Sequence, residues 1–471
     1  MMARRFDFCD RALVAAFLIA VVVGTWNRVL LVNDGAYFLS VTWLGDAWDL
    51  YFNQFVGRAV SLMVAFGPVW ALRWAFAPSA ATHIVMGHLL FFAVPLCLWL
   101  AVRSVEPTRI HSRLYLAAIL ALIYFPSEII VAAGLWMIWI AAIAKVRPAG
   151  QVIALTLGFA VVLAFTHPAA AMMSLLYFAV GGIATASGRP FPRHTLKPAA
   201  AMMILLVLGY VLTSWLAPST NPSIIAMQGA SSRDYVDPLW MTSTVVLFPM
   251  LATVWLLLLA PGVAQLGQRW RLTPRGVAII GVIGLWFAAN AASLYLYLFA
   301  RHTVADVLAV ALALALAGSP AEWLEGARRP LLWCAAITAT ATLSYNVDVF
   351  MLRRFVDRHL VPGVVDVDQQ ASMAWPKHVG RGLFETRLYF KWIAGADYVR
   401  DVVVPDYEPY RQVLAFISFF DSDRRSVLYH QLPRTHWIPF ECPALDRAAA
   451  HAHDDDDRRF LVFLRDNYCV P

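Results

Sequence analysis

The sequence predicts an all-α polytopic membrane protein of about eleven transmembrane helices, followed by a small mixed α/β domain outside the cytoplasm. Of its 471 residues, 60% are hydrophobic and 14% are charged, and the mean hydropathy is +0.63. A soluble globular protein has about 25% charged residues. Apolar windows long enough to cross a bilayer, about 20 residues each, recur along most of the chain.

The first predicted spans are 12–32 and 82–102. The stretch "MMARRFDFCDR" precedes the first without an A-x-A-like cleavage site, so that span reads as an anchor. The segments 113–145 and 148–188 each predict two helices, because "YFPSEII" interrupts the former and "FTHPAAA", with Pro168, interrupts the latter. The remaining windows are 198–232, 238–268, 276–300, 303–318 and 330–347.

The segment 55–76, "FVGRAVSLMVAFGPVWALRWAF", decides the predicted topology, because every later loop changes side if it spans. If it does not span, the cytoplasmic segments hold 16 Lys and Arg residues and the outer loops hold Arg58, Arg73, Arg233 and Arg301. Cytoplasmic loops of membrane proteins are enriched in Lys and Arg. We therefore interpret 55–76 as an interfacial helix, with Trp70 and Trp74 at headgroup level.

This topology places the N-terminus in the cytoplasm and divides the chain in two. Residues 1–350 form the transmembrane domain, with a long first outer loop at 33–80 that carries juxtamembrane helices, and residues 351–471 form the extracytoplasmic domain. Cys442 and Cys469 share that domain, so a disulfide between them is expected, with two free thiols as the alternative. The net charge of +7 belongs to the cytoplasmic loops and indicates no nucleic-acid partner.

The predicted topology gathers ionisable residues on the outer face, where such groups are usually functional or paired. They are Arg28, Asp34, Asp46, Asp49, Arg58, Glu128, His167, Arg301 and His302. Each has a simpler interpretation. Asp34, Asp46 and Glu128 could sit at helix N-termini. His167 could be a turn residue before a proline, and Arg28 could extend to the interface.

The segment "NDGAYFL" resembles the acidic-x-x-Tyr segment of the GT-C superfamily of membrane glycosyltransferases, with Asp34 at the acid and Tyr37 at the aromatic position. "FGPVWALRWAFAPSAATH" resembles the Pro-containing amphipathic helix that leads into the family's second span. "FPSEII" resembles its outer turn between spans 3 and 4, where Glu128 matches a second acid. The resemblance covers the first four spans in motifs and the remainder in architecture.

The resemblance implies an inverting enzyme that moves a sugar from a polyprenyl (di)phosphate to the hydroxyl of a glycan, lipid or protein. Asp34 would be the general base and Glu128 a second catalytic acid. The substrate-binding candidates are Arg28, Tyr37, Asp46, Asp49, Arg58, His167, Arg301 and His302. Many members carry two adjacent acids where this chain has "NDG", so we expect no cofactor, with a divalent cation as the alternative. We expect the protein to lie in a bacterial inner membrane, with the membrane lipids as partners.

Other functions stay open. A lipid-linked sugar flippase or other transporter should show internal repeats and polar residues at mid-span, and the chain shows neither. An O-antigen polymerase or ligase-like enzyme has a similar number of spans but depends on cations in large outer loops, and the outer loops here have few. A scaffold without enzymatic activity is the third alternative.

Overall fold

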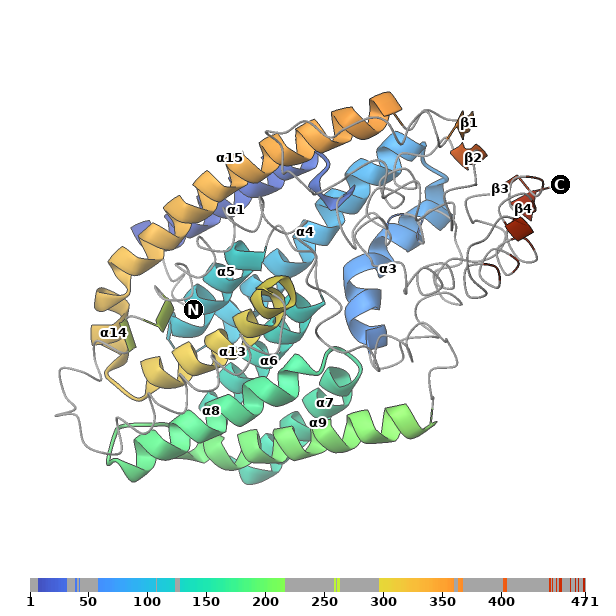
Figure 1. The fold of residues 1–471 in the computed structure, drawn as a ribbon. Coiled ribbons are helices and arrows are strands. Elements are labelled where there is room, and N and C mark those ends of the chain that lie inside the picture. The colour runs from blue at the N-terminus through green and yellow to red at the C-terminus, as the bar shows by residue number, and fades with distance from the viewer. Residues whose placement is uncertain are drawn as a thin grey trace.

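The fold is a bundle of apolar helices (Figure 1). This computed structural model describes residues 7–31, 39, 42, 58–106, 108–122, 128–216 and 296–359, four short strands, and some single residues or pairs elsewhere. Its first helices are α1 (Phe8–Trp26), the 3₁₀ turn η1 (Val29–Leu31), α3 (Ala59–Phe76) and α4 (Ala80–Val105). The central group is α5 (Ile110–Leu122), α6 (Ile129–Lys145), α7 (Ala149–Ala164) and α8 (Ala169–Ala186).

The remaining helices are η4 (Arg193–Thr195), α9 (Leu196–Leu216), α13 (Leu296–Leu316), α14 (Pro320–Gly326) and α15 (Arg328–His359). The two helix pairs predicted within 113–145 and 148–188 are confirmed as α5 with α6 and α7 with α8. Short connections join α4 to α5 and α5 to α6, and the helices of each of these pairs pack against each other. Helices with short connections pack antiparallel. Helices α7 and α8 both pack against α9.

Helix α5 is the centre of the bundle. It packs against α1, α4, α6, α13 and α15, and its residues from Ile110 to Ala121 are all buried. Its 13 residues extend about 20 Å, less than the ~30 Å of a bilayer core. Because its residues are buried against five other helices, α5 contacts protein and not lipid acyl chains.

Helices α1 and α15 lie side by side and run in the same direction (Figure 1). At one end, Cys9 of α1 lies within electrostatic range of Arg328, the first residue of α15. At the other end, the amide of Asn27, just after α1, donates to the side-chain oxygen of buried Asn346 at 3.0 Å. The first and last described helices of the bundle are therefore parallel neighbours.

Helix α4 extends past the end of α1, and α3 packs against that extension. Phe92 of α4 lies beside Gly24 near the end of α1, so about three turns of α4 precede that level. The rings of Phe66 and Phe91 stack with centroids 5.4 Å apart. Helix α3 starts beside α6 and finishes just before α4 begins, so both of its ends lie at one end of the bundle.

Two predicted boundaries are wrong. Helix α1 ends at Trp26, within the predicted span 12–32, and Arg28 follows with φ of 56° in the left-handed region. Arg28 therefore lies in the bend between α1 and η1 and not in the last turns of a helix. Helix α13 runs without interruption through Arg301 and His302, where a loop between two spans was predicted. "LYLFARHTVADVL" contains no Gly or Pro to break a helix there.

The predicted boundary at residues 350 and 351 falls inside α15, which continues to His359. Beyond it lie four short strands: β1 (Gly363–Asp366), β2 (Asp401–Val404), β3 (Phe440–Glu441) and β4 (Cys469–Val470). They form one sheet in the order β1-β2-β3-β4. The β1–β2 and β2–β3 pairs are antiparallel, and the β3–β4 pair is parallel. The predicted α/β domain stays a prediction beyond this sheet.

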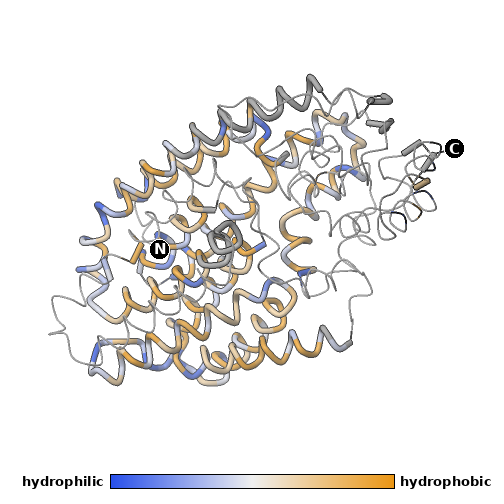
Figure 2. Tube along the Cα trace, in the orientation of Figure 1, coloured by the Kyte–Doolittle hydropathy of each residue, from blue (hydrophilic) through white to orange (hydrophobic). Residues whose placement is uncertain are grey.

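Hydrophobic residues cover the outside of the helices as well as their contacts (Figure 2). Within the described residues, five helices are long and apolar enough to cross a membrane: α1, α3, α4, α8 and the stretch from Arg193 to Thr213. Trp26, Trp74 and Trp215 are each more than 70% exposed, which suits the membrane–water interface. The chain is a membrane protein.

Candidate functional site

Three of the predicted outer-face residues converge at one end of the bundle. Arg58 precedes the first residue of α3, Glu128 precedes α6, and His167 lies in the turn between α7 and α8. The Arg58 guanidinium lies 3.6 Å from the Glu128 carboxylate. The Glu128 side chain is 3% exposed and that of Arg58 is 36% exposed. A buried anion is thus paired with a cation that still reaches solvent.

Backbone contacts hold the α7–α8 turn against the start of α3. The Val60 N–H donates to the Phe165 carbonyl at 2.8 Å. The Ser61 hydroxyl lies 2.9 Å from the carbonyls of both Arg58 and Thr166. These bonds place the residue after Thr166, which is His167, next to the segment that carries Arg58.

The His167 imidazole is 3% exposed and takes part in the turn. Its Nδ1 accepts a hydrogen bond from the Ala169 N–H at 3.1 Å, which satisfies one of the donors at the start of α8. The simpler interpretation of His167 as a turn residue is therefore confirmed, because its Nδ1 bonds to the backbone within the turn. Because Nδ1 is an acceptor, the neutral ring carries its proton on Nε2.

Glu128 does not cap α6 through its side chain. The predicted position of this residue at a helix N-terminus is confirmed, and its carboxylate lies near the Arg58 guanidinium. The N-terminal dipole of α6 still favours an anion at this position. Tyr210 of α9 is a neighbour that the sequence analysis did not single out. Its hydroxyl donates to the Leu163 carbonyl at 3.0 Å and lies within electrostatic range of Arg58.

The segment between α1 and α3 contacts α4 at two described points. The Leu30 N–H donates to Nε2 of buried His88 at 2.9 Å. Nε2 of buried His83 lies 3.1 Å from the Thr42 hydroxyl and 3.3 Å from the Leu39 carbonyl. Asp34 and Tyr37 lie between these points in the sequence.

The other predicted site residues fall outside what the structure describes. Asp34, Tyr37, Asp46, Asp49 and Cys442 lie outside the described residues. Arg301 and His302 lie in the second turn of α13, and Cys469 lies in β4, but the placement of these three side chains is outside the description. Their predicted roles, and the disulfide between Cys442 and Cys469, stay predictions.

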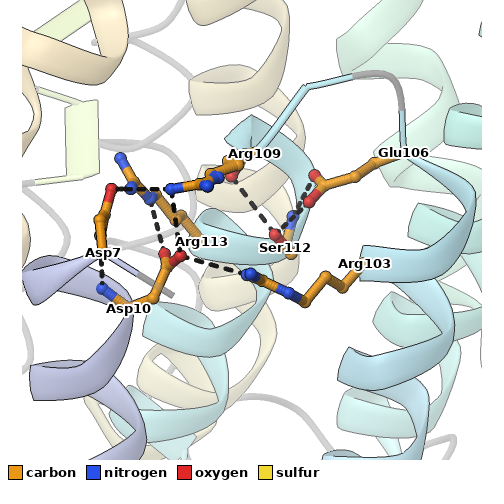
Figure 3. A network of polar contacts seen from close by, with 7 residues as sticks. All are labelled: Asp7, Asp10, Arg103, Glu106, Arg109, Ser112 and Arg113. Carbon is orange, nitrogen blue, oxygen red and sulfur yellow. Dashed lines mark hydrogen bonds and ion pairs between the residues drawn. The ribbon is translucent and has the colours of Figure 1, made fainter. Parts of the chain in front are cut away.

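A second polar cluster, at the opposite end of the bundle, was missed (Figure 3). Arg113 of α5 donates from Nε to Asp10 at 2.8 Å and also pairs with Asp7. Arg103 reaches Asp10 at 3.2 Å, and Arg109 reaches Asp7 at 3.1 Å. The three arginines are among the 16 cations that predict the cytoplasmic segments, and that count does not reveal their pairing with the two acids at the start of α1. This cluster ties α1, α4 and α5 together.

In the same cluster, the buried Glu106 carboxylate accepts hydrogen bonds from the Ser112 hydroxyl and from the Ser112 N–H, the latter at 2.9 Å. Nδ1 of buried His111 lies 3.9 Å from this carboxylate. These bonds close the turn between α4 and α5. Asp7, Asp10 and Glu106 each have a neighbouring cation or donor, as a structural fastening requires.

Among the described residues, no three His, Cys, Asp or Glu side chains gather closely enough to hold a metal ion. Cys9, Cys97 and Cys334 form no disulfide.

The fold and its apolar helices define the class of this protein as a multi-helix membrane protein. Comparison of the chain with protein-family models, curated proteins and solved structures finds no match.

Proposed function

We propose that this protein is a membrane glycosyltransferase of the GT-C type, which moves a sugar from a polyprenyl (di)phosphate to an acceptor hydroxyl outside the cytoplasm. One observation carries the proposal. Arg58, Glu128 and the turn of His167 come from three distant segments and meet at one end of the bundle. The loop that contains Asp34 is fastened to α4, whose first turns extend from this same end.

In the proposed reaction, Asp34 accepts the proton of the acceptor hydroxyl while that oxygen attacks the anomeric carbon. The bond between the anomeric carbon and the phosphate oxygen breaks, and its electron pair leaves with the lipid phosphate. Direct attack inverts the anomeric centre. A carboxylate within ~3 Å of the hydroxyl contributes about 10²–10⁴-fold to the rate as a general base.

Arg58 is the described cation best suited to the leaving phosphate. A guanidinium carries five N–H donors, so it can serve a carboxylate and a phosphate together. Its side chain is 36% exposed, which leaves it within reach of a ligand. Glu128 would hold the guanidinium in place from its buried side. Stabilising the charge that develops on the leaving group is a large term in such reactions.

The proposed arrangement in the membrane follows the charge count of the sequence. The N-terminus and the cluster of Asp7, Asp10 and Arg113 face the cytoplasm, and Arg58 and Glu128 face outward. Helix α3 lies in the interface, about eleven spans cross the bilayer, and residues beyond α15 form an outer domain. A nucleotide sugar is absent on the outer side, so the sugar must arrive on a lipid.

The decisive test compares Asp34→Asn with the wild type in transfer of labelled sugar from a polyprenyl-phosphate donor by purified protein. Asn caps a helix as well as Asp does but cannot take a proton at neutral pH. We expect a folded variant that binds donor and turns over at least ~100-fold more slowly.

Glu325→Gln removes an exposed carboxylate on α14 and should leave turnover unchanged. Near-normal turnover of Asp34→Asn would return this residue to a capping role, whereas a wild type that transfers no sugar from the donor would favour the flippase.

A further inference from the structure

We infer that His83 and His88 are positioning residues, which fasten to α4 both ends of the segment that carries Asp34. The catalytic consequence rests on the proposed function, whereas the fastening can be tested without any sugar transfer. Both imidazoles are at most 1% exposed, and both bond to residues of the first outer loop or of η1.

His88 holds the start of the segment in one tautomer. Its Nδ1 lies 2.7 Å from the Ile84 carbonyl, one turn earlier in α4, and donates to it. Its Nε2 is therefore an acceptor, and it receives the Leu30 N–H at 2.9 Å. The ring connects the backbone of η1 to the backbone of α4. A buried bond of this kind contributes about 0.5–1.5 kcal/mol net and costs more when one partner is removed.

His83 holds the far end of the segment. Its Nε2 approaches both the Thr42 hydroxyl and the Leu39 carbonyl, at 3.1 and 3.3 Å. The Thr42 hydroxyl donates to the same Leu39 carbonyl at 3.0 Å. That hydroxyl proton is used, so the Nε2–H of His83 is the donor in this group.

Packing adds to the hydrogen bonds at this second point. The Leu39 side chain is fully buried and lies over Gly87 of α4, between α3 and α4. A Cβ added at Gly87 would overlap the Cδ2 methyl group of Leu39 and would lie 3.6 Å from its Cγ. Gly87 therefore makes room for Leu39 one turn after His83.

The two fastenings enclose a short piece of chain. Asp34 is four residues after Leu30 and five before Leu39. Eight residues lie between Leu30 and Leu39. Fixing the chain at both of these positions removes conformational freedom that a base on a free loop would lose at each turnover. A general base must stay within hydrogen-bond reach of its proton, and a misplacement of 1 Å can cost about 10²-fold in rate.

The fastening is tested by cross-linking the full-length protein in membranes. The double variant Leu39→Cys with Gly87→Cys places two thiols at this contact, where Cγ of Leu39 lies 3.6 Å from the position of a Cβ at residue 87. Disulfides form only between residues this close together. We expect the two introduced thiols to link rapidly with copper phenanthroline in air, as shown by peptide mass spectrometry. Adding His83→Ala should lower the linking rate several-fold.

Activity then tests the positioning role. His83→Ala alone should lower kcat at least tenfold and leave the KM for lipid donor unchanged, because the misplaced base affects the transition state. Linking the two thiols in the triple variant should restore turnover, and a reductant should abolish it again. His194→Ala removes an exposed histidine at the opposite end and should change neither result.

Failure to form the link in the double variant, or an unchanged linking rate with His83→Ala, would overturn the inference. So would a normal kcat for His83→Ala in an enzyme that transfers sugar. If the wild type transfers no sugar from any lipid donor, the proposed function fails instead, and the linking rates still decide whether His83 fastens the loop.

Discussion

Asp7 and Asp10 stand at the start of α1, where carboxylates also favour the helix dipole. Asp7 accepts a hydrogen bond from the Asp10 N–H at 3.0 Å as the N-cap of α1. Burial alone would raise the pKa of Asp7, but this backbone bond and the charges of Arg113 and Arg109 together hold the pKa below its ordinary value. The fold therefore favours the ionised form of Asp7.

The lowered pKa of Asp7 makes the stability of the fold depend on pH. A carboxylate with a depressed pKa stabilises the fold above its unfolded pKa of about 3.9 and loses that contribution as pH falls through the lower, folded value. We expect the thermal unfolding midpoint in detergent to fall on acidification below about pH 4. Asp7→Asn should flatten that part of the profile and lower the midpoint at neutral pH.

Asp446→Asn removes a carboxylate that is 57% exposed and serves as the control. Profiles of Asp7→Asn and wild type that stay parallel from pH 3 to 7 would contradict the assignment.

At this scale, the sequence predicted which residues would share a face but not which would pair. Its cation count placed Arg58 and Glu128 on one side, and the structure pairs them across 70 residues. Asp7 and Arg113 are 106 residues apart, and only the packing of α1 on α5 brings them together. A local sequence pattern does not show which residues far apart in the chain will contact each other. The proline that follows His167 did indicate a turn residue, and the bond from the Ala169 N–H to its Nδ1 confirms it.

At the scale of elements, close approach of helices depends on small residues. Gly134 of α6 faces Tyr115 of α5 and Leu98 of α4, and an added Cβ would lie within 3 Å of both side chains. The Tyr115 hydroxyl donates to the Ile130 carbonyl at 2.9 Å, so its ring cannot move aside without losing a buried bond. The α4–α5–α6 contact therefore requires glycine at this position.

We expect Gly134→Ala to destabilise the protein by about 1–3 kcal/mol, as overpacking of a core does. Gly158 of α7 is the matched control, because nothing lies within 4 Å of a Cβ added there. Gly158→Ala should be neutral or slightly stabilising, since alanine favours a helix over glycine. Thermal unfolding in detergent measures both, and equal effects at the two glycines would refute this account of the α4–α5–α6 contact.

Element prediction succeeded where the sequence contains strong breaks and failed where it does not. Pro168 and the "YFPSEII" segment separate their helices as predicted. The predicted boundary near Arg301 rested only on the charge of this residue. A charged residue does not by itself end a helix, and α13 continues through Arg301. Helix α1 ends early because Asn27 and the left-handed Arg28 turn the chain into η1, which an apolar count cannot detect.

At the scale of the molecule, the side of each loop can be measured. Reporter fusions after Pro78, between α3 and α4, and after His359, at the end of α15, should both report the outer compartment. A fusion after Gly188, between α8 and η4, should report the cytoplasm. The expectation follows from the excess of Lys and Arg in the cytoplasmic segments. A cytoplasmic signal after Pro78 would mean that α3 crosses the membrane.

The parallel pairing of α1 with α15 also constrains the biogenesis of the protein. The bond between Asn27 and Asn346 joins residues 319 positions apart, so the ribosome makes one partner long before the other. Before α15 is inserted, the face of α1 that packs against it lacks this neighbouring helix. The contact between α1 and α15 thus forms only after α15 has been synthesised, and premature termination before α15 leaves this face of α1 without the helix that packs on it.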